Sequence, residues 1–545
     1  MAKTMAIIIF LIILIIIKPL EIINISGVKA VSDEDLIATN CLNVPASVFI
    51  DTLKNSMEGV VKVASIVSKF TGFISDFRVS NAVADCLDLL ELSSDELSWT
   101  LSASQFGKSN GTGNLALDLK TWLSASLINQ ETCLEGFEGT STFVKELVSG
   151  SINQVSSLVQ QVLHMVHLAP GPTHASHLGR AKGTPPRSGG RRLMAKVNDV
   201  DGFPSWIRSK DRKLLQSSVR DITPNVIVAL DGRGDFTKIM DAIAAAPSHS
   251  TNRFVIYVKK GVYDEIVEIK RKKTYIMLYG DGIDATIITG NRNVFDGYTT
   301  YRSATFAVTG ANFIARDITF QNTAGPEKHQ AVAFRSDSDL SAIYRCAFRG
   351  YQDTLYAHAN RQFFRECTIT GTVDFIFGDA VAIFQSCLIQ SRKGLSNQKN
   401  TITAQGRKDP GENTGFSLQF CNITGDTSLT TGTNSSTNST TTYTYLGRPW
   451  KAYSRTVIMQ SYISNVIRPE GWLEWNGNLY LDTLFYAEYM NYGPGASLSS
   501  RVKWPGYHIF DSSAQALNYT VAQFINGDEW LPNTGVRFTS GLSVV

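Results

Sequence analysis

A short segment recurs six times in the second half of the chain, and it restricts the fold more than any other feature of the sequence. Its first aligned position holds Asp317, Cys346, Cys367, Cys387, Cys421 and Ser461, and two residues later stand Thr319, Phe348, Ile369, Ile389, Ile423 and Ile463. Successive cysteines are 21 and then 20 residues apart, which is about one coil of a parallel β-helix. The later intervals, from Cys387 to Cys421 and on to Ser461, are longer and indicate coils with inserted loops. The region is therefore predicted to be an all-β parallel β-helix.

The first half of the chain shows a different periodicity. Apolar residues recur at intervals of three and four between about residues 45 and 168, which is typical of amphipathic helices. Residues 169–190 lose this pattern and concentrate Pro, Gly and Ser, a composition that cannot hold a packed core. We therefore predict an all-α helical domain over residues 31–168, a linker over 169–215 and the β-helix over 216–545.

The N-terminus reads as a secretory signal peptide, residues 1–30. Lys3 precedes an unbroken apolar run, residues 6–17, and small residues at Val28 and Ala30 suit a cleavage site. The run is shorter than the roughly 20 residues of a membrane-spanning helix, although an uncleaved anchor is the alternative. Glycosylation motifs at Asn110, Asn422, Asn434, Asn438 and Asn518 fit a secretory route. The protein is thus expected to be secreted.

Two basic motifs lie in the predicted linker. One is Arg191-Arg192-Leu193-Met194, and the other is Arg212-Lys213-Leu214-Leu215. Exposed segments of this kind are preferred sites of proteolysis. Cleavage after Leu215 is predicted to release a β-helix that begins near Gln216.

The seven cysteines are an odd number, so at least one thiol has no disulfide partner within the chain. Equivalent positions of a β-helix stack about 4.8 Å apart, which lies within the Cα separation of a disulfide. We predict a Cys367–Cys387 disulfide, with a stack of buried free thiols as the alternative. In the helical domain, Cys86 and Cys133 are predicted to join two helical segments.

Two carboxylates stand among aromatic and β-branched residues, where a buried charge is costly unless it is paired or used. Asp353 and Asp374 are one coil length apart in the sequence, so they should face each other on adjacent coils, and Gln330 precedes Gln352 by nearly the same interval. Close carboxylates differ in pKa, which yields one nucleophile and one proton donor, and two amides suit an oxyanion. The alternative is a polar ladder that only satisfies its own hydrogen bonds.

The segments around these residues closely resemble the plant pectin methylesterases, or pectinesterases. The matching motifs are GVYDE at 261, AGPEKHQAVAFR at 324, GYQDTLYAH at 350, GTVDFIFG at 371, ITAQGRKDP at 402 and LGRPWKAYSRT at 446. The resemblance implies a right-handed parallel β-helix. The first half is similar to the pectin methylesterase inhibitor domain, a four-helix bundle that many of these enzymes carry as a pro-region.

The resemblance also implies roles for the candidate residues. Asp374 would be the nucleophile on the methyl-ester carbonyl, and Asp353 the general acid and later the general base. Gln352 and Gln330 would hold the oxyanion.

Three further residues would serve the substrate. Arg448 would pair with Asp374 and keep it ionised. Trp450 would stack on a galacturonic acid ring, and Thr300 would be a weaker substrate contact.

The sequence as a whole is thus interpreted as a secreted pectinesterase zymogen of the cell wall, with an autoinhibitory or retention pro-region. It would convert homogalacturonan to pectate and methanol, as a monomer and without metal or organic cofactor. Its expected partners are methyl-esterified pectin, a subtilisin-like processing protease and pectinesterase inhibitor proteins. A net charge of +3 without a basic stripe gives no indication of nucleic-acid binding. The alternatives are a β-helix depolymerase of the polygalacturonase or lyase type, and a non-catalytic cell-wall binding or inhibitor protein.

Overall fold

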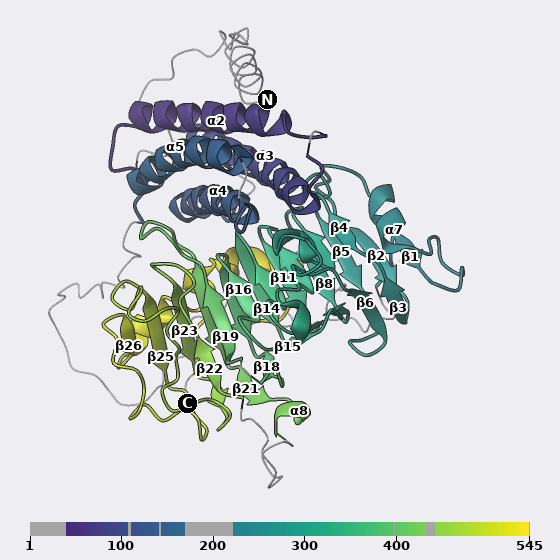
Figure 1. Ribbon diagram of the computed structural model, residues 1–545, viewed down its shortest axis with the longest axis vertical. Coiled ribbons are helices and arrows are strands. Elements are labelled where there is room, and N and C mark those ends of the chain that lie inside the picture. Colours follow the sequence, from purple (N-terminus) through teal and green to yellow (C-terminus); the bar gives the residue numbers. More distant parts are fainter. Residues whose placement is uncertain are drawn as a thin grey trace, which may run out of the picture.

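The structure consists of a bundle of long helices that lies against a β-helix (Figure 1). It is a computed structural model, and it describes residues 40–72, 74–106, 111–140, 143–168, 222–396, 398–430 and 442–543. We refer to residues 40–168 as the helical half and to residues 222–543 as the β-helix. The predicted signal peptide, the linker with both basic motifs, and Asn110, Asn434 and Asn438 lie outside the described residues.

Within its described residues the helical half has four long helices, as the sequence predicts. They are α2 (Ala46–Ser68), α3 (Phe77–Phe106), α4 (Leu115–Gly136) and α5 (Phe143–Met165). The Asn114 side chain accepts a hydrogen bond from the Leu117 amide and thereby caps the start of α4. A disulfide joins Cys86 of α3 to Cys133 of α4, which confirms that prediction.

Three parallel sheets form the β-helix among the described residues. In order across each sheet, the first contains β1 (Val226–Val228), β2 (Phe254–Val258), β5 (Ile276–Tyr279), β8 (Ile314–Arg316), β11 (Ser341–Tyr344), β14 (Arg361–Arg365), β17 (Val381–Gln385), β20 (Gly415–Gln419), β23 (Arg455–Met459), β25 (Phe485–Tyr489) and β26 (Tyr507–Ile509). The second contains β22 (Thr444–Gly447), β19 (Asn400–Gln405), β16 (Ile376–Gly378), β13 (Leu355–Ala357), β10 (Phe334–Ser336), β7 (Phe306–Val308) and β4 (Val267–Ile269). The third contains β24 (Tyr462–Ile463), β21 (Asn422–Gly425), β18 (Leu388–Ser391), β15 (Thr368–Gly371), β12 (Ala347–Arg349), β9 (Thr319–Asn322), β6 (Thr286–Gly290) and β3 (Gly261–Asp264).

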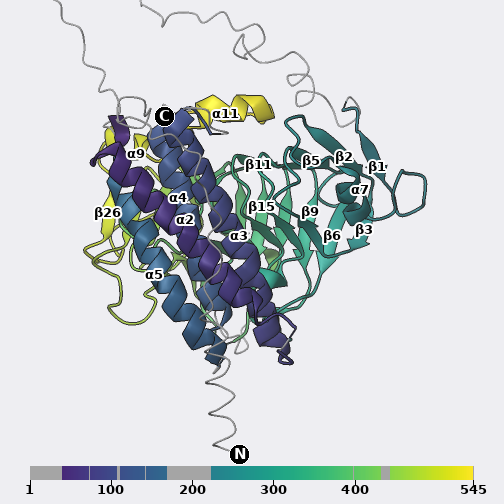
Figure 2. The ribbon, with the colours of Figure 1, turned by 90° about the horizontal axis from the view of Figure 1, so that it is seen from above.

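Short helical elements lie between and after the strands. They are α7 (Ile239–Ala245), η4 (Tyr301–Ser303), η5 (Pro326–Lys328), α8 (Thr427–Thr430), α9 (Ser513–Leu517), α10 (Val521–Phe524) and α11 (Gly527–Thr534). Seen from above, the bundle crosses one side of the β-helix, while β1, β2, β3 and α7 form an end that the bundle does not cover (Figure 2).

The predicted coil register is confirmed for five of the six segments. Phe348 pairs with Ile369, and the same alignment continues through Ile389, Ile423 and Ile463. These side chains are buried and stack in the interior of the β-helix.

The first segment of the alignment was wrong by one residue. Thr319 pairs with Ala347, so Ile318 rather than Asp317 is the equivalent of Cys346. Asp317 instead occupies the corner that precedes the inward-facing residue. Its carboxylate lies 2.8 Å from Nε of Arg316.

These corners share one backbone conformation, which supports the corrected register. The residue before the inward position has a positive φ, between 48° and 58°, in every segment of the repeat: Asp317, Arg345, Glu366, Ser386, Phe420 and Gln460. The left-handed region costs an ordinary residue roughly 1–2 kcal/mol. The strain persists because pairing on both sides fixes each corner.

The predicted Cys367–Cys387 disulfide is wrong in this structure, and the alternative of a thiol stack is correct. Cys346, Cys367, Cys387 and Cys421 are buried free thiols. Stacked side chains project in parallel, so their Cβ atoms stay near the coil spacing instead of converging to the roughly 3.8 Å that a disulfide requires. The Cys367 thiol donates to the carbonyl of Arg365 at 3.4 Å instead.

Candidate active site

The two predicted carboxylates occupy the same position on successive coils of the second sheet. Leu355 of β13 pairs with Ile376 of β16, and Asp353 and Asp374 each stand two residues earlier. Both have left-handed backbone, with φ of 64° and 52°. The Asp353 amide donates to the carbonyl of Val373 at 3.0 Å and thereby links the two turns. Only 7% and 6% of the two aspartates is exposed, so their charges need partners.

Asp374 is held as a charged acceptor by two side chains from later coils. Arg448 donates from Nε at 2.8 Å to Oδ1 and from Nη2 at 2.6 Å to Oδ2. Thr401 donates its hydroxyl to Oδ1 at 2.6 Å, and its Oγ1 accepts the Asp374 amide at 2.9 Å. Burial lowers the pKa of Arg448, but the hydrogen bonds and charge of Asp374 outweigh that effect and raise it. The fork-like pairing fixes the orientation of the Asp374 carboxylate.

Asp353 is in a different electrostatic environment. Burial, and secondly the negative charge of Asp374, raise its pKa well above the ordinary value, while Arg448 only partly counters them. A raised pKa favours the protonated form of this carboxyl. The site therefore combines an ion-paired carboxylate with a neighbouring carboxyl whose environment favours the protonated form, which is the pairing that nucleophilic and acid catalysis require.

The other predicted site residues line the same cavity, which has a volume of about 340 Å³. Gln330, Gln352, Thr300, Arg448 and Trp450 all contribute to its wall together with the two aspartates. The half-buried Trp450 ring lies 6.0 Å from the ring of Phe377.

Sequence reasoning missed the residues that contact the Asp374–Arg448 pair. Thr401 lies on the coil after Asp374, and the register of β16 with β19 places it at the equivalent position. That signal was hidden because an insertion lengthens the interval between these two residues beyond one regular coil. Trp475 lies under the guanidinium of Arg448, 4.3 Å from it, and no repeat spacing marks this residue.

The helical half forms part of the cavity wall, and the sequence did not predict which of its residues lie there. Arg78 of α3 and Thr132, Glu135 and Gly136 of α4 belong to the cavity wall, as does Glu138, which follows α4. Thr132 Oγ1 lies 2.8 Å from Nε2 of the buried His358.

Ion pairs with largely buried carboxylates join the two halves. Arg302 Nε donates to Asp85 of α3 at 2.6 Å. Arg361, which is fully buried, pairs with Asp118 of α4 and with Asp339 at 2.6 Å. The helical half therefore covers the candidate site by specific contacts.

Within the residues that the structure describes, no three His, Cys, Asp or Glu side chains gather in the manner of a metal site. In the same residues, no helix has the length and apolarity to cross a membrane.

Comparison with known proteins identifies both halves. Residues 225–528 match the family model "Pectinesterase", and residues 37–165 match "Plant invertase/pectin methylesterase inhibitor". The chain is 59% identical to "Pectinesterase/pectinesterase inhibitor PPE8B" of Prunus persica, over 94% of this chain and 92% of the relative. It is 58% identical to "Probable pectinesterase/pectinesterase inhibitor 44" of Arabidopsis thaliana, over 94% of this chain and 97% of the relative.

A solved structure shares the fold of the β-helix. The structure "Pectin methylesterase from Carrot" is 53% identical, with a TM-score of 0.57, and the match covers 60% of this chain and 99% of that chain. The chain described here belongs to the pectinesterase family of carboxylic ester hydrolases and carries an inhibitor-like helical domain before its catalytic domain.

Proposed function

We propose that the chain hydrolyses the methyl esters of cell-wall pectin to pectate and methanol, with Asp374 as the nucleophile. The observation that carries this proposal is the contrast between two neighbouring aspartates. Asp374 receives both donor groups of Arg448, whereas burial raises the pKa of Asp353. One carboxylate is therefore available for attack while its neighbour holds a proton.

In this mechanism an Asp374 oxygen attacks the ester carbonyl carbon, and the carbonyl oxygen becomes an oxyanion. The side-chain amides of Gln352 and Gln330 donate hydrogen bonds to that oxyanion. The tetrahedral intermediate collapses, the bond to the methoxy oxygen breaks, and Asp353 transfers its proton to that oxygen to release methanol. Asp353 then removes a proton from water, the hydroxide attacks the acyl carbon, and the Asp374 carboxylate leaves.

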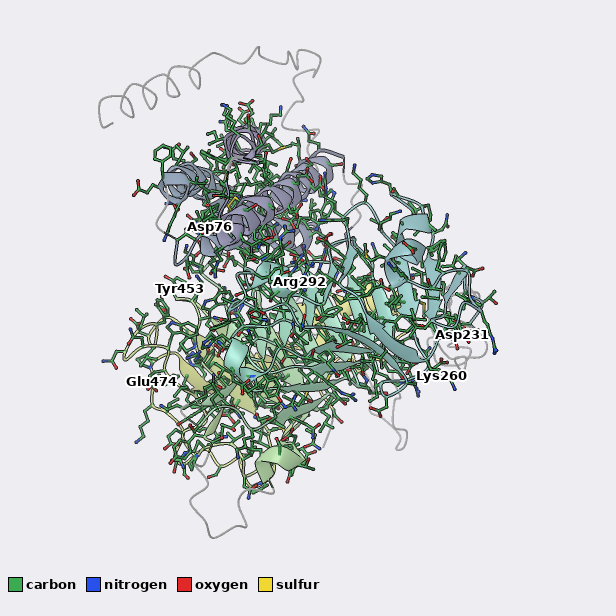
Figure 3. All side chains as sticks on the ribbon, turned by 45° about the vertical axis from the view of Figure 1, so that its right-hand side comes forward. Asp76, Asp231, Lys260, Arg292, Tyr453 and Glu474 are labelled. Atoms are coloured by element: carbon green, nitrogen blue, oxygen red, sulfur yellow. A yellow bond between two sulfur atoms is a disulfide. The ribbon has the colours of Figure 1, made fainter. Side chains whose placement is uncertain are left out.

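The mechanism is tested on residues 216–545, since the helical half covers the cavity. Asp374→Asn should lower methanol release by roughly 10³-fold or more with an unchanged melting temperature, because the amide is not a nucleophile. Asp353→Asn should also lower methanol release severely. Gln352→Ala should lower kcat by roughly 10²- to 10³-fold. Asp231→Asn serves as the matched control, because Asp231 is exposed and lies at the end of the β-helix that is remote from the bundle (Figure 3). Activity losses that scale with lost stability in all three variants would favour the structural polar ladder.

The same assay decides between the alternatives. A pectinesterase releases methanol while the length of the polymer stays constant. Shortening of the polymer would identify a depolymerase, and an absence of both changes would identify a binding protein.

We further propose that the chain is made as a secreted zymogen in which the helical half blocks its own catalytic domain. The support is the position of Thr132 and Glu135 in the wall of the catalytic cavity. A subtilisin-like protease would cut the linker after Leu215, and a separate inhibitor protein of the same helical fold would compete for the uncovered face. Replacing both Arg191 and Arg212 by Ala should increase the mass of the secreted product, and an unchanged mass would contradict this processing scheme.

A further inference from the structure

Two lysines lie beside the catalytic cavity without a role in the mechanism above. Lys408 follows β19, and Lys451 follows β22 and comes directly after Trp450. They line a second cavity of about 140 Å³. This cavity shares Glu135 and Trp450 with the catalytic cavity, so the two cavities adjoin.

The partners of these lysines come from the helical half. Lys451 Nζ lies 2.6 Å from Glu135 Oε1 and 3.2 Å from Glu131 Oε1. Lys408 Nζ pairs with the other oxygen of Glu131. Every ion pair that the described residues give to these two lysines thus ends on α4.

Removal of α4 would leave both lysines without these carboxylate partners. While α4 is in place, only 17% of the Lys451 side chain is exposed. Neighbouring ammonium groups that line a cavity attract an anion. Glu131 and Glu135 are one helical turn apart on α4, so they present two carboxylates on the same helix face.

We infer that Lys408 and Lys451 form a subsite for the free carboxylates of galacturonate, and that Glu131 and Glu135 occupy it in their place. The inference rests on the proposed function for the identity of the polymer. Each hydrolysed ester leaves one carboxylate on the chain, so the product of one turnover supplies the anion that this subsite binds. The Lys451 Nζ lies 5.1 Å from the centre of the Trp450 ring, which places the charge beside a platform for a sugar ring.

A consequence for specificity follows. An ester next to already hydrolysed residues would bind with its neighbours on the lysines, whereas a fully esterified chain offers them no charge. The two lysines therefore favour hydrolysis beside earlier products and bias the enzyme toward contiguous de-esterified stretches.

The experiment uses residues 216–545, which have a core of their own built from β-helix residues. It compares kcat/KM on half-esterified and on fully esterified homogalacturonan. Lys451→Gln and Lys408→Gln should each lower the ratio of kcat/KM on the half-esterified polymer to kcat/KM on the fully esterified polymer. The expected decrease is about tenfold, as for one lost charge-assisted contact. Lys451→Arg keeps the charge and should retain most of the preference.

The control is Lys260→Gln. Lys260 is exposed and lies at the end of the β-helix remote from the bundle, whereas Tyr453, two residues after Lys451, lies just beneath the bundle (Figure 3). The control should leave both kcat/KM values unchanged. An unchanged ratio in Lys451→Gln and Lys408→Gln would overturn the inference and restrict both lysines to the contact with α4.

Failure of the proposed function has a different signature. If residues 216–545 release methanol from neither polymer, the esterase assignment fails, and binding of fully de-esterified trigalacturonate by calorimetry decides the subsite. Binding that is about tenfold weaker in Lys451→Gln supports the subsite, and equal binding overturns it.

Discussion

The helical half should bind the β-helix more tightly as the pH falls from about 7 to about 4.5. Burial raises the pKa of Glu135 from 4.5 to about 7, despite the opposing effect of Lys451. When the halves separate, the exposed carboxyl returns to its ordinary pKa. Between the two pKa values the closed state binds one more proton than the open state, so protons favour closure, and this contribution is lost as the pH rises through about 7.

The size of the effect follows from the two pKa values. At about 1.4 kcal/mol per unit, the change from 4.5 to about 7 amounts to about 3 kcal/mol, or roughly 300-fold in the Kd of the separated halves. Burial also raises the pKa of Asp85 and Glu96 on α3, and these carboxyls act in the same direction. The pKa of Glu131 is lowered, although burial opposes this, because Lys451 and Lys408 outweigh it. Its opposite contribution is lost only below the ordinary glutamate pKa.

The assay uses a chain with an engineered protease site within residues 169–221, cut so that the halves are held by contacts alone. The Kd is measured by titrating the purified halves from about pH 8 to about pH 5. Glu135→Gln imitates the protonated form, so it should tighten binding at the upper end and flatten the pH dependence. A Kd that is constant or that falls toward high pH would refute the reasoning, as would weaker binding by Glu135→Gln at about pH 8.

Three further perturbations test the structural account. Thr401→Val removes the hydroxyl that bonds Asp374, and it should lower kcat by roughly tenfold with a loss of about 1 kcal/mol in the free energy of unfolding, measured by denaturant titration. Arg448→Lys replaces a two-pronged donor by a single ammonium and should lower kcat by roughly 10²-fold with little change in KM, so an unaltered kcat would contradict the role of the paired contact. Replacing Cys86 and Cys133 together by Ser should destabilise the helical half by about 2–4 kcal/mol in thermal unfolding, while the activity of residues 216–545 is independent of that disulfide.

The regular coil spacing predicted the side-chain positions that repeat from coil to coil. The stacking of Phe348 with Ile369, and the approach of Asp353 to Asp374, follow from a fixed coil length. Cysteine spacing, by contrast, constrains the distance between Cα atoms but not the direction of the side chains. The Cys367–Cys387 prediction failed for that reason.

The contacts between the two halves could not be predicted from the sequence, for a further physical reason. Thr132 and Glu135 lie on α4. Helical periodicity identifies the faces of a helix, but it does not tell what an exposed face contacts. Their partners His358 and Lys451 belong to the β-helix, on the far side of the linker in the sequence. Such pairs become visible only once the two folds are docked.

The ion pairs between the halves also bear on how the β-helix reaches its native state. In a solenoid each coil contacts only its neighbours, so coils can separate one after another. The helical half contacts Arg302, Arg361 and Lys408, which stand on three different coils. Helical segments form quickly and emerge first during synthesis, whereas parallel strands assemble slowly. The bundle thus provides a preformed template along which successive coils can align, and refolding of residues 40–545 should be faster and more complete than refolding of residues 222–545.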